Sequence, residues 1–375
     1  MKSPRLQRLF HDGAASGLRW LGIKTARTDF PPSANGSPVA MVQKAGSFRQ
    51  ANTLSSFLDN TEPAETEWSW PEKQCWRFSN VNLVGSSGTL FFPDGSLWES
   101  SSSDARGPVG KIRPPLTWMA RSVDSPCVHL CGMNDENRGH FVMEILPRLE
   151  ALLSAHPEAA SYHFLVPAGQ TLWQARFFEF YGIKPNQLIE QGPGTTRLRE
   201  LWMVPFLNGF DKLADPQWHL AVADRFSPKS LPGPTEGPAL WVSRRTAPNK
   251  RILNEDRLLE IMEKICGHVE STELIGVPLD EQARIFRRSP LIVGGYGQGM
   301  VNTLFARDSN VLILTSNPSY KKPSWPRAFQ QLAQIPGNRA HCLLGSGNFS
   351  TNENYTVDET KFTALFAQLW EKRMT

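Results

Sequence analysis

Residues 290–300 have the sequence PLIVGGYGQGM, a short apolar run that ends in a glycine-rich loop. The run is typical of a buried strand, and the residues after the loop, NTLFARD (302–308), predict a helix. Further strands, predicted at 239–245, 269–276 and 310–316, alternate with amphipathic helical patterns. Buried strands that alternate with helices are typical of a parallel sheet built from βαβ units.

The chain before this region shows a second series of the same kind. Its predicted strands and helices alternate, beginning with a strand, at 128–130, 138–155, 162–168, 173–183 and 200–206. The segment SPKSLPGPTEGP (227–238) is the best linker candidate, because Pro and Gly interrupt both helices and strands. The sequence therefore predicts an α/β protein with two Rossmann-like lobes facing a cleft, at residues 76–230 and 231–375.

The N-terminal part of the chain, residues 1–75, is predicted to lie outside these lobes. Residues 1–27 carry six basic residues, one acid and several apolar residues, which predicts a basic amphipathic helix. Such a helix is able to lie on an anionic membrane surface, and a solvated or domain-packed helix explains the pattern equally well. Residues 28–75 are rich in Pro, Ser, Thr, Asn and Glu and predict an irregular arm. A small antiparallel β meander follows at 77–98, with Pro93-Asp94-Gly95 as a turn.

The composition disfavours several classes of protein. In 375 residues, 40 Lys and Arg stand against 36 Asp and Glu, and the net charge of +4 is low for a protein that binds nucleic acid. No run reaches the roughly 18 apolar residues of a membrane span, and residues 1–27 lack the apolar core of a secretion signal. Five cysteines without regular spacing favour a reducing compartment. We therefore expect a cytoplasmic protein, able to lie on the inner face of the cell membrane, that does not bind nucleic acid.

Basic residues follow the first predicted strand of the second lobe. Ser243 and Arg244 stand at its carboxyl end, and Arg251 lies in the next loop. Asn254 is expected to cap the following helix. In open α/β sheets the ligand lies beyond the carboxyl ends of the strands, and the paired N–H donors of arginine suit a diphosphate there. A solvated turn with surface ion pairs is the alternative interpretation.

The glycine-rich loop lies in the same lobe. Gly295, Gly297 and Gly299 stand at alternate positions, so that backbone N–H groups are able to approach an anion closely. A dinucleotide-binding fingerprint would have its third glycine at Met300, and no Lys-Ser/Thr pair follows for a Walker loop. A nicotinamide-dependent dehydrogenase is therefore disfavoured. A tight turn between strand and helix is the alternative to an anion site.

A third set of polar residues lies in the first predicted helix of the first lobe. His140, Glu144 and Arg148 recur every four residues and form one stripe beside an apolar face that begins with Phe141. Pro147 should kink the helix. A carboxylate one turn from an imidazole orients the ring and raises its basicity, so the His–Glu pair is a candidate general base. A purely structural pair explains the same spacing.

The spacing of Cys127, His129 and Cys131 also invites a zinc interpretation. Their alternation places all three side chains on one face of a strand, and a strand held in a sheet does not easily wrap a tetrahedral ion. No Asp-X-Asp pair is present to hold a metal against a diphosphate. We therefore expect no metal site.

These clusters resemble, in their order, the motifs of glycosyltransferase family 61, which includes bacterial capsular and exopolysaccharide transferases. Three motifs carry the resemblance, and the matching positions are Asn137, His140, Glu144, Leu146, Pro147, Arg148 and Leu149, then Ser243, Arg244, Arg251, Asn254 and Glu255, then Glu281, Gln282, Phe286 and the run 294–302. Glu144 stands where the family usually has Asp, and Tyr296 stands where it usually has His. The resemblance spans about residues 76–320.

The resemblance implies a GT-B fold that performs an inverting, metal-independent sugar transfer. The donor would be a nucleotide diphosphate sugar, UDP-linked above all, and the acceptor a hydroxyl of a glycan or glycolipid in polysaccharide biosynthesis such as capsule formation. His140 would be the base, with Glu144 orienting it or acting in its place, and Asn137 and Arg148 would support the acceptor or the helix. The residues implied for the donor site are Ser243, Arg244, Arg251, Tyr296, Gly297, Gln298, Gly299 and Asn302. The last helix, at 358–373, is expected to pack back across the first lobe.

The departures at Glu144 and Tyr296 leave a second function open. A catalytically inactive protein of the same fold would bind a nucleotide sugar or a polysaccharide without turning it over. Neither function implies a cofactor, because the nucleotide sugar is a substrate.

Overall fold

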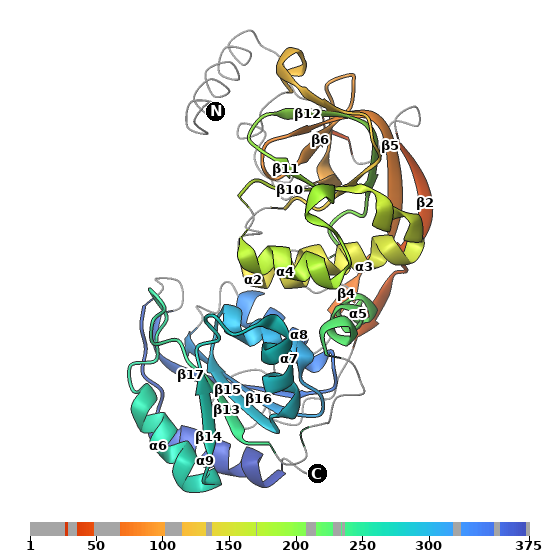
Figure 1. Ribbon diagram of the computed structural model, residues 1–375. Coiled ribbons are helices and arrows are strands. Elements are labelled where there is room, and N and C mark those ends of the chain that lie inside the picture. The colour runs from red at the N-terminus through yellow and green to blue at the C-terminus, as the bar shows by residue number, and fades with distance from the viewer. Residues whose placement is uncertain are drawn as a thin grey trace. The chain divides into compact units, whose positions relative to one another are not determined.

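The computed structural model describes residues 27–28, 36–48, 68–101, 115–132, 137–169, 171–207, 215–227, 234, 237–317, 324–348 and 353–372. These residues form two compact units (Figure 1). The first unit contains the described residues up to Ala45 together with Pro71–Leu207, and the second contains the remaining described residues. The chain enters the second unit ahead of the proposed linker, because α5 (Pro216–Phe226) packs on η8 (Gln298–Phe305) of that unit.

The first unit is built on one ten-stranded sheet. Eight strands follow one another in the order β1 (Arg27–Thr28), β7 (Leu97–Trp98), β6 (Thr89–Phe91), β5 (Lys73–Val84), β12 (Thr195–Met203), β9 (Cys127–His129), β10 (His163–Pro167) and β11 (Leu188–Gln191). In addition, β2 (Gly36–Gln43) pairs with β5, and β8 (Arg121–Val123) pairs with β12. The strands β5, β6 and β7 are antiparallel, which confirms the predicted meander. The Rossmann-like part of this mixed sheet consists of the parallel strands β12, β9, β10 and β11.

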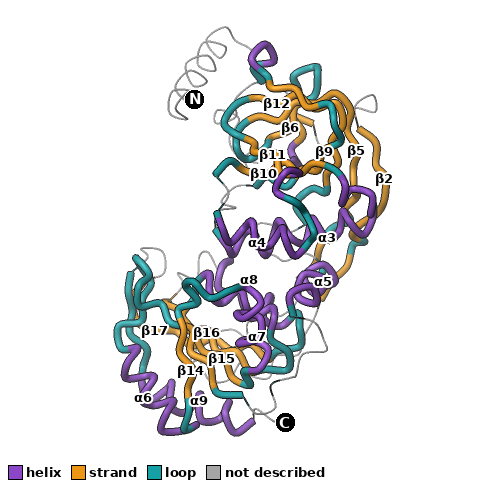
Figure 2. The backbone as a smooth tube through the Cα atoms, in the orientation of Figure 1, coloured by secondary structure: helices purple, strands orange, loops and turns teal. Residues whose placement is uncertain are grey.

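Two helical connections join the parallel strands of the first unit (Figure 2). The connections consist of α2 (Arg138–His140), the π-helix η5 (Phe141–Ile145) and α3 (Leu146–Ala155) between β9 and β10, and of α4 (Leu172–Phe180) between β10 and β11. The predicted apolar face, which begins with Phe141, is buried. The expected interruption at Pro147 takes the form of the π turn directly before it. Proline has no N–H to donate and its ring crowds the preceding turn, so a wider turn accommodates it.

The second unit is built on a five-stranded parallel sheet, which confirms the predicted βαβ series. The strand order is β14 (Val269–Thr272), β13 (Ala239–Val242), β15 (Leu291–Gly295), β16 (Asn310–Asn317) and β17 (Arg339–Asn348). The helices of this sheet are α6 (Glu255–Cys266), α7 (Leu279–Arg288), η8, α8 (Ser324–Gln334) and α9 (Glu359–Glu371). The direction in which successive strands are added to the sheet reverses between β13 and β15. After β13 the chain adds β14 at one edge, and then adds β15, β16 and β17 on the opposite side of β13. Ligands of open α/β sheets bind beyond the carboxyl ends of the strands at such a point.

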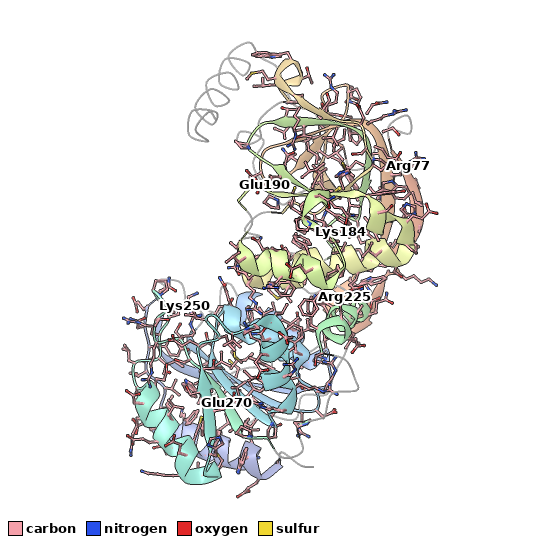
Figure 3. All side chains as sticks on the ribbon, in the orientation of Figure 1. Arg77, Lys184, Glu190, Arg225, Lys250 and Glu270 are labelled. Atoms are coloured by element: carbon pink, nitrogen blue, oxygen red, sulfur yellow. The ribbon has the colours of Figure 1, made fainter. Side chains whose placement is uncertain are left out.

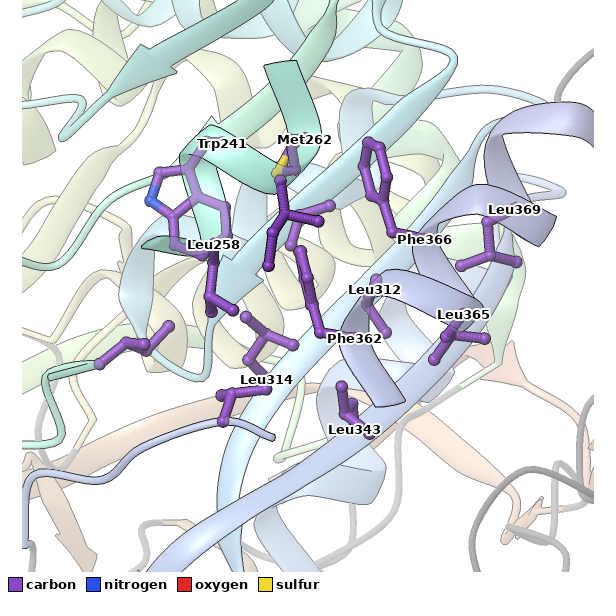
Figure 4. Close-up of a cluster of buried hydrophobic side chains, with 14 of the residues drawn as sticks. Trp241, Leu258, Met262, Leu312, Leu314, Leu343, Phe362, Leu365, Phe366 and Leu369 are labelled. Atoms are coloured by element: carbon purple, nitrogen blue, oxygen red, sulfur yellow. The ribbon is translucent and has the colours of Figure 1, made fainter. Parts of the chain in front are cut away.

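The core of the second unit includes the last helix (Figure 4). Phe362 and Phe366 of α9 lie in one buried cluster with Trp241. The side-chain amide of Asn310 in β16 donates a hydrogen bond to the carbonyl of Leu369 in α9. The expectation that this helix packs across the first lobe is therefore wrong. Its apolar face packs on α6 and the sheet of its own unit, and each large side chain buried there contributes about 1.5–3 kcal/mol.

Some segments expected to be irregular form strands. The strand β2 lies within the arm predicted at 28–75, as do β3 (Gly46–Phe48) and β4 (Trp68–Trp70), which pair with each other in the second unit. The prediction of an irregular arm is wrong for these residues. The sequence does not indicate β17 either, because RAHCLLGSGN has neither a continuous apolar run nor a clear alternation. Pairing with strands distant in the chain decides these cases, and local patterns do not show it.

The basic helix predicted at the N-terminus falls on residues 1–26, outside the described part of the chain, and on Arg27, which lies in β1. Among the helices that the structure describes, none combines the length and the apolar character needed to cross a lipid bilayer.

His341 of β17 is a buried imidazole whose ring nitrogens have no hydrogen-bond partner among the described residues. Burial, and to a smaller extent Arg339, lowers the pKa of this side chain from 6.5 to about 3. The ring therefore stays neutral in the folded protein, whereas the unfolded chain takes up a proton as the pH falls below 6.5. Lowering the pH from 7 to 5 should consequently remove about 2 kcal/mol from the free energy of unfolding through this residue.

The variant His341→Leu removes this titration at a similar side-chain volume. Its free energy of unfolding, measured by urea denaturation, should exceed that of the unchanged chain by about 2 kcal/mol more at pH 5 than at pH 7. A variant whose stability depends on pH as steeply as that of the unchanged chain would contradict the assignment. The buried His129 of the first unit, whose pKa is also lowered to about 3, remains in both proteins and gives both the same background slope.

Candidate functional site

The structure brings together the two motifs that are predicted to hold an anion. Arg244 follows β13, and its guanidinium lies against Gly297 in the loop after β15, where an added methyl group would overlap Nη1 of the arginine. A methyl group at Gly295 would lie 3.0 Å from Cδ of the same side chain. The absence of side chains at these two glycines therefore leaves the space that Arg244 occupies.

No carboxylate of the described residues balances the charge of Arg244. Its Nε donates to the carbonyl of Lys250 at 3.4 Å, and its Nη2 donates to the carbonyl of Asn249 at 3.2 Å. Burial lowers the pKa of Arg244 below its usual value. Burial also lowers the pKa of Lys250, and the nearby charge of Arg244 lowers it further. Arg251 is exposed, and its guanidinium bonds to none of the described residues. This end of the sheet is therefore positively charged.

Glu255, the first residue of α6, fixes the turn that carries Arg244. Its Oε1 accepts hydrogen bonds from Trp241 Nε1 at 3.0 Å, Ser243 Oγ at 2.6 Å and Arg245 Nε at 3.2 Å. The residues on either side of Arg244 are thus held by one buried carboxylate. We interpret Glu255 as a positioning residue, and Ser243 as part of the same hydrogen-bond network.

The loop that carries Arg251 is held by the C-terminal part of the chain. The N–H of Tyr355 donates to the carbonyl of Arg251, and the hydroxyl of Tyr355 donates to the carbonyl of Leu314 in β16. Asn254 occupies the N-cap position of α6, but its side chain does not cap the helix as expected. The amide instead donates to the carbonyl of Val357 at 2.8 Å and accepts from its N–H at 3.0 Å. Asn254 therefore binds a backbone segment far along the chain.

Tyr296 stands in the glycine-rich loop at the position where the resembled family usually has histidine. Its N–H donates to the carbonyl of Leu314, and its ring packs against Phe329 at a centroid distance of 4.8 Å. The Nζ of Lys250 lies 5.3 Å from the centroid of the same ring (Figure 3). Burial raises the pKa of the Tyr296 hydroxyl above its usual value of 10.0, so the group is neutral at neutral pH. The residue thus supplies an aromatic face and no charge.

The remaining residues of the predicted donor set differ in accessibility. Gln298 is exposed and begins η8, whereas Gly299 packs closely on Val242, so that a methyl group would lie 2.8 Å from its Cγ1. Asn302 is fully buried, and its amide donates to Oε1 of Gln282 in α7 at 3.0 Å. Asn302 therefore supports the loop through α7, and its side chain is not open to a ligand.

The first unit holds the pair predicted as a general base. Nδ1 of His140 lies 3.0 Å from Oε1 of Glu144, and the two side chains are 17% and 24% exposed. Asn137 supports the pair by accepting the N–H of Gly139 at the start of the helix. A carboxylate at Nδ1 places the proton there and leaves Nε2 as the basic nitrogen of the neutral ring. The pair spans the π turn, a conformation that is frequent at functional sites.

Arg148 lies apart from this pair, although it belongs to the same predicted stripe. It is 1% exposed, and its guanidinium donates to the carbonyls of Val204, Cys131 and His129. Its Nη2 also contacts Nδ1 of His129, whose Nε2 lies 2.8 Å from the carbonyl of Gly88. Arg148 is therefore buried among backbone carbonyls of its own unit and presents almost no surface to an acceptor. Both ring nitrogens of His129 are engaged within the protein.

A known family matches a segment of the chain that includes most of these residues. Residues 139–313 match the family model described as Glycosyltransferase 61. This segment belongs to glycosyltransferase family 61. It contains both the His140–Glu144 pair and the loop of Gly297, and it confirms the resemblance that the three sequence motifs indicate. No curated protein matches the chain.

The match over residues 139–313 supports a glycosyltransferase, and this family implies a nucleotide-sugar donor and a glycan acceptor. Within the second unit, the structure brings Arg244 and the glycine-rich loop together, as the motifs indicate. The only sequence signal for Lys250 is the basic run NKR (249–251). No motif marks Tyr355, whose contact with Arg251 depends on the fold of the C-terminal segment.

Proposed function

We propose that this glycosyltransferase moves a sugar from a UDP-linked donor to a hydroxyl of a glycan or glycolipid acceptor in polysaccharide biosynthesis. The position of Arg244 carries the proposal. Its partly buried guanidinium has no carboxylate partner among the described residues and lies against Gly297 beyond the carboxyl ends of β13 and β15. A diphosphate would supply the paired oxygen acceptors that a guanidinium binds best.

In this proposal the second unit holds the donor. Arg244 and Arg251 bind diphosphate oxygens, and the N–H groups at the start of η8, residues 298–299, add further donors. The same groups stabilise the negative charge that develops on the diphosphate as its bond to the sugar breaks. Because cationic side chains perform this role, the reaction needs no metal ion.

The first unit supplies the base. Glu144 holds the Nδ1–H of His140, and Nε2 removes the proton of the acceptor hydroxyl as its oxygen attacks the anomeric carbon of the donor sugar. A single displacement of this kind inverts the configuration at that carbon. The two units then correspond to the lobes of a GT-B enzyme. Residues 1–27 provide peripheral contact with the inner face of the membrane, where a glycolipid acceptor would be found.

The first test is release of nucleotide from a panel of UDP-, GDP- and CMP-sugars, measured with candidate acceptors and in excess EDTA. We expect UDP release whose rate EDTA leaves unchanged, together with a product of inverted anomeric configuration in its NMR spectrum. Loss of activity in EDTA that Mg²⁺ or Mn²⁺ restores would contradict the metal-independent mechanism. Binding of UDP-sugars without turnover of any donor would instead identify the catalytically inactive binding protein.

A further inference from the structure

The short 3-10 helix η4 (Thr117–Met119) of the first unit presents two large apolar side chains to solvent. Trp118 is 77% exposed and Met119 is 55% exposed. The backbone beside them is anchored, because the N–H of Leu116 donates to Oγ1 of Thr195 in β12 at 3.0 Å. The two exposed side chains thus stand on a fixed turn, where water contact with their apolar surface is unfavourable.

Three arginines lie on β8 and β12, the strands nearest to η4 in the chain and in the fold. Nη2 of Arg197 in β12 donates to the carbonyl of Thr117 at 3.3 Å, which places its guanidinium beside η4. Nη2 of Arg121 in β8 donates to the carbonyl of Glu190 at 2.9 Å. Arg199 is exposed two residues beyond Arg197, and therefore on the same face of β12. The guanidinium groups of Arg121 and Arg197 bond to backbone carbonyls and form no ion pair with the described residues.

Arginine is the most frequent charged residue around η4. Residues 115–123 and 195–199 contain three arginines and no acid. Three acids lie nearby. Glu200 follows Arg199, lies on the other face of β12 and pairs with Arg77, whereas Asp124 and Glu190 are exposed. The face of β12 that holds Arg197 and Arg199 therefore carries no acid of that strand.

This combination fits the surface of an anionic bilayer. Tryptophan favours the headgroup region, where its ring is apolar and its N–H stays hydrated, and arginine binds lipid phosphates through paired donors. A soluble protein partner would need an interface of about 1,200 Å² or more, whereas the apolar part of this surface is two neighbouring side chains. We propose that η4, with Arg121, Arg197 and Arg199, is a docking surface for anionic phospholipids. It is distinct from residues 1–27 and does not depend on the proposed sugar transfer.

The test is flotation of the full chain with vesicles of phosphatidylcholine alone and with vesicles that also contain phosphatidylglycerol. The double variant Trp118→Ser, Met119→Ser should lower binding to the anionic vesicles by about 10-fold or more. The double variant Arg197→Gln, Arg199→Gln should lower it by about 30-fold, because each charge at the surface contributes about one factor of five. Binding to phosphatidylcholine alone should be weak for every protein.

A matched control comes from the second unit, where Leu253 and Ile275 are 63% and 74% exposed. The double variant Leu253→Ser, Ile275→Ser should bind anionic vesicles as the unchanged chain does. All these side chains are exposed, so thermal unfolding should show that each variant keeps its fold. Equal binding of the unchanged chain to both kinds of vesicle would overturn the role of the arginines.

Two further outcomes would overturn the docking surface itself. In the first, both double variants of η4 and β12 bind anionic vesicles normally, while Lys2→Gln, Arg5→Gln, Arg8→Gln does not, and the contact then belongs to residues 1–27. In the second, Trp118→Ser, Met119→Ser leaves vesicle binding unchanged and abolishes self-association in sedimentation. The exposed pair would then be an interface between copies of the chain.

Discussion

Replacing His140 with alanine should lower the turnover number of sugar transfer by about 10²- to 10⁴-fold, the usual contribution of a positioned general base. The Michaelis constant for the donor should change little, because the proposed donor groups lie on the second unit. Steady-state kinetics of UDP release with saturating acceptor measures both quantities. His163→Ala is the matched control, since His163 is a half-buried histidine on β10 of the same unit. It should leave the turnover number within a few-fold.

Glu144→Gln separates the charge of the carboxylate from its hydrogen bond. The amide oxygen still accepts from Nδ1 of His140, so the ring keeps its orientation, but it loses the charge that raises its basicity. The turnover number should fall less than in His140→Ala. If Glu144→Gln lowers the turnover number severely while His140→Ala leaves it nearly normal, Glu144 is the base. Nearly normal activity of both variants would show that neither residue is.

Replacing Arg244 with glutamine should weaken binding of UDP by about 10- to 100-fold, because a charged hydrogen bond to a phosphate contributes about 1.5–3 kcal/mol. Gly297→Ala should act in the same direction without removing the charge, since its methyl group displaces the guanidinium of Arg244. The displaced group is the mobile end of a side chain, so the melting temperature should change little. Isothermal titration calorimetry with UDP measures both effects.

The chain offers a matched control for each of these variants. Arg257→Gln removes an exposed arginine of the same unit, whose charge is already paired with Glu260 and Glu359, and should leave the affinity for UDP nearly unchanged. Gly194→Ala places a methyl group where nothing lies within 4 Å and should do the same. Unchanged affinity in Arg244→Gln would remove the observation on which the proposed function rests.

The parallel sheet of the second unit could be predicted because its central strands are buried on both faces. Ile292 and Val293 point to opposite sides of β15, and both are inaccessible, so the sequence there is a continuous apolar run. The strand β17 lies at the edge and contains Arg339 and His341, which hide its pattern. The position of α9 depends on which apolar face fits against α6, and no local pattern determines that.

The candidate site could be predicted in its residue types more than in its contacts. Arg244 and Gly297 are types that suit an anion, but their meeting depends on β13 and β15 being neighbours in the sheet. Arg148 is of the same type, yet its partners are carbonyls of residues 129, 131 and 204, which the fold brings around it. Asn254 stands at the N-cap position of α6, but its side-chain amide donates a hydrogen bond to the carbonyl of Val357 instead of capping the helix. Tertiary hydrogen bonds of this kind leave no periodic trace in the sequence.

The pairing of Asn254 with Val357 joins residues that are 103 positions apart in the chain. A chain that leaves the ribosome from its N-terminus lacks this support for the Arg251 loop until Val357 has been made. Bringing residues so far apart in the chain together costs conformational entropy before the contact forms. This entropy cost slows folding. We therefore expect the loop of Arg251 to become ordered only after residues 355–357 have been made. Nascent chains that stop short of residue 353 lack the backbone groups of Tyr355 and Val357 that hold this loop.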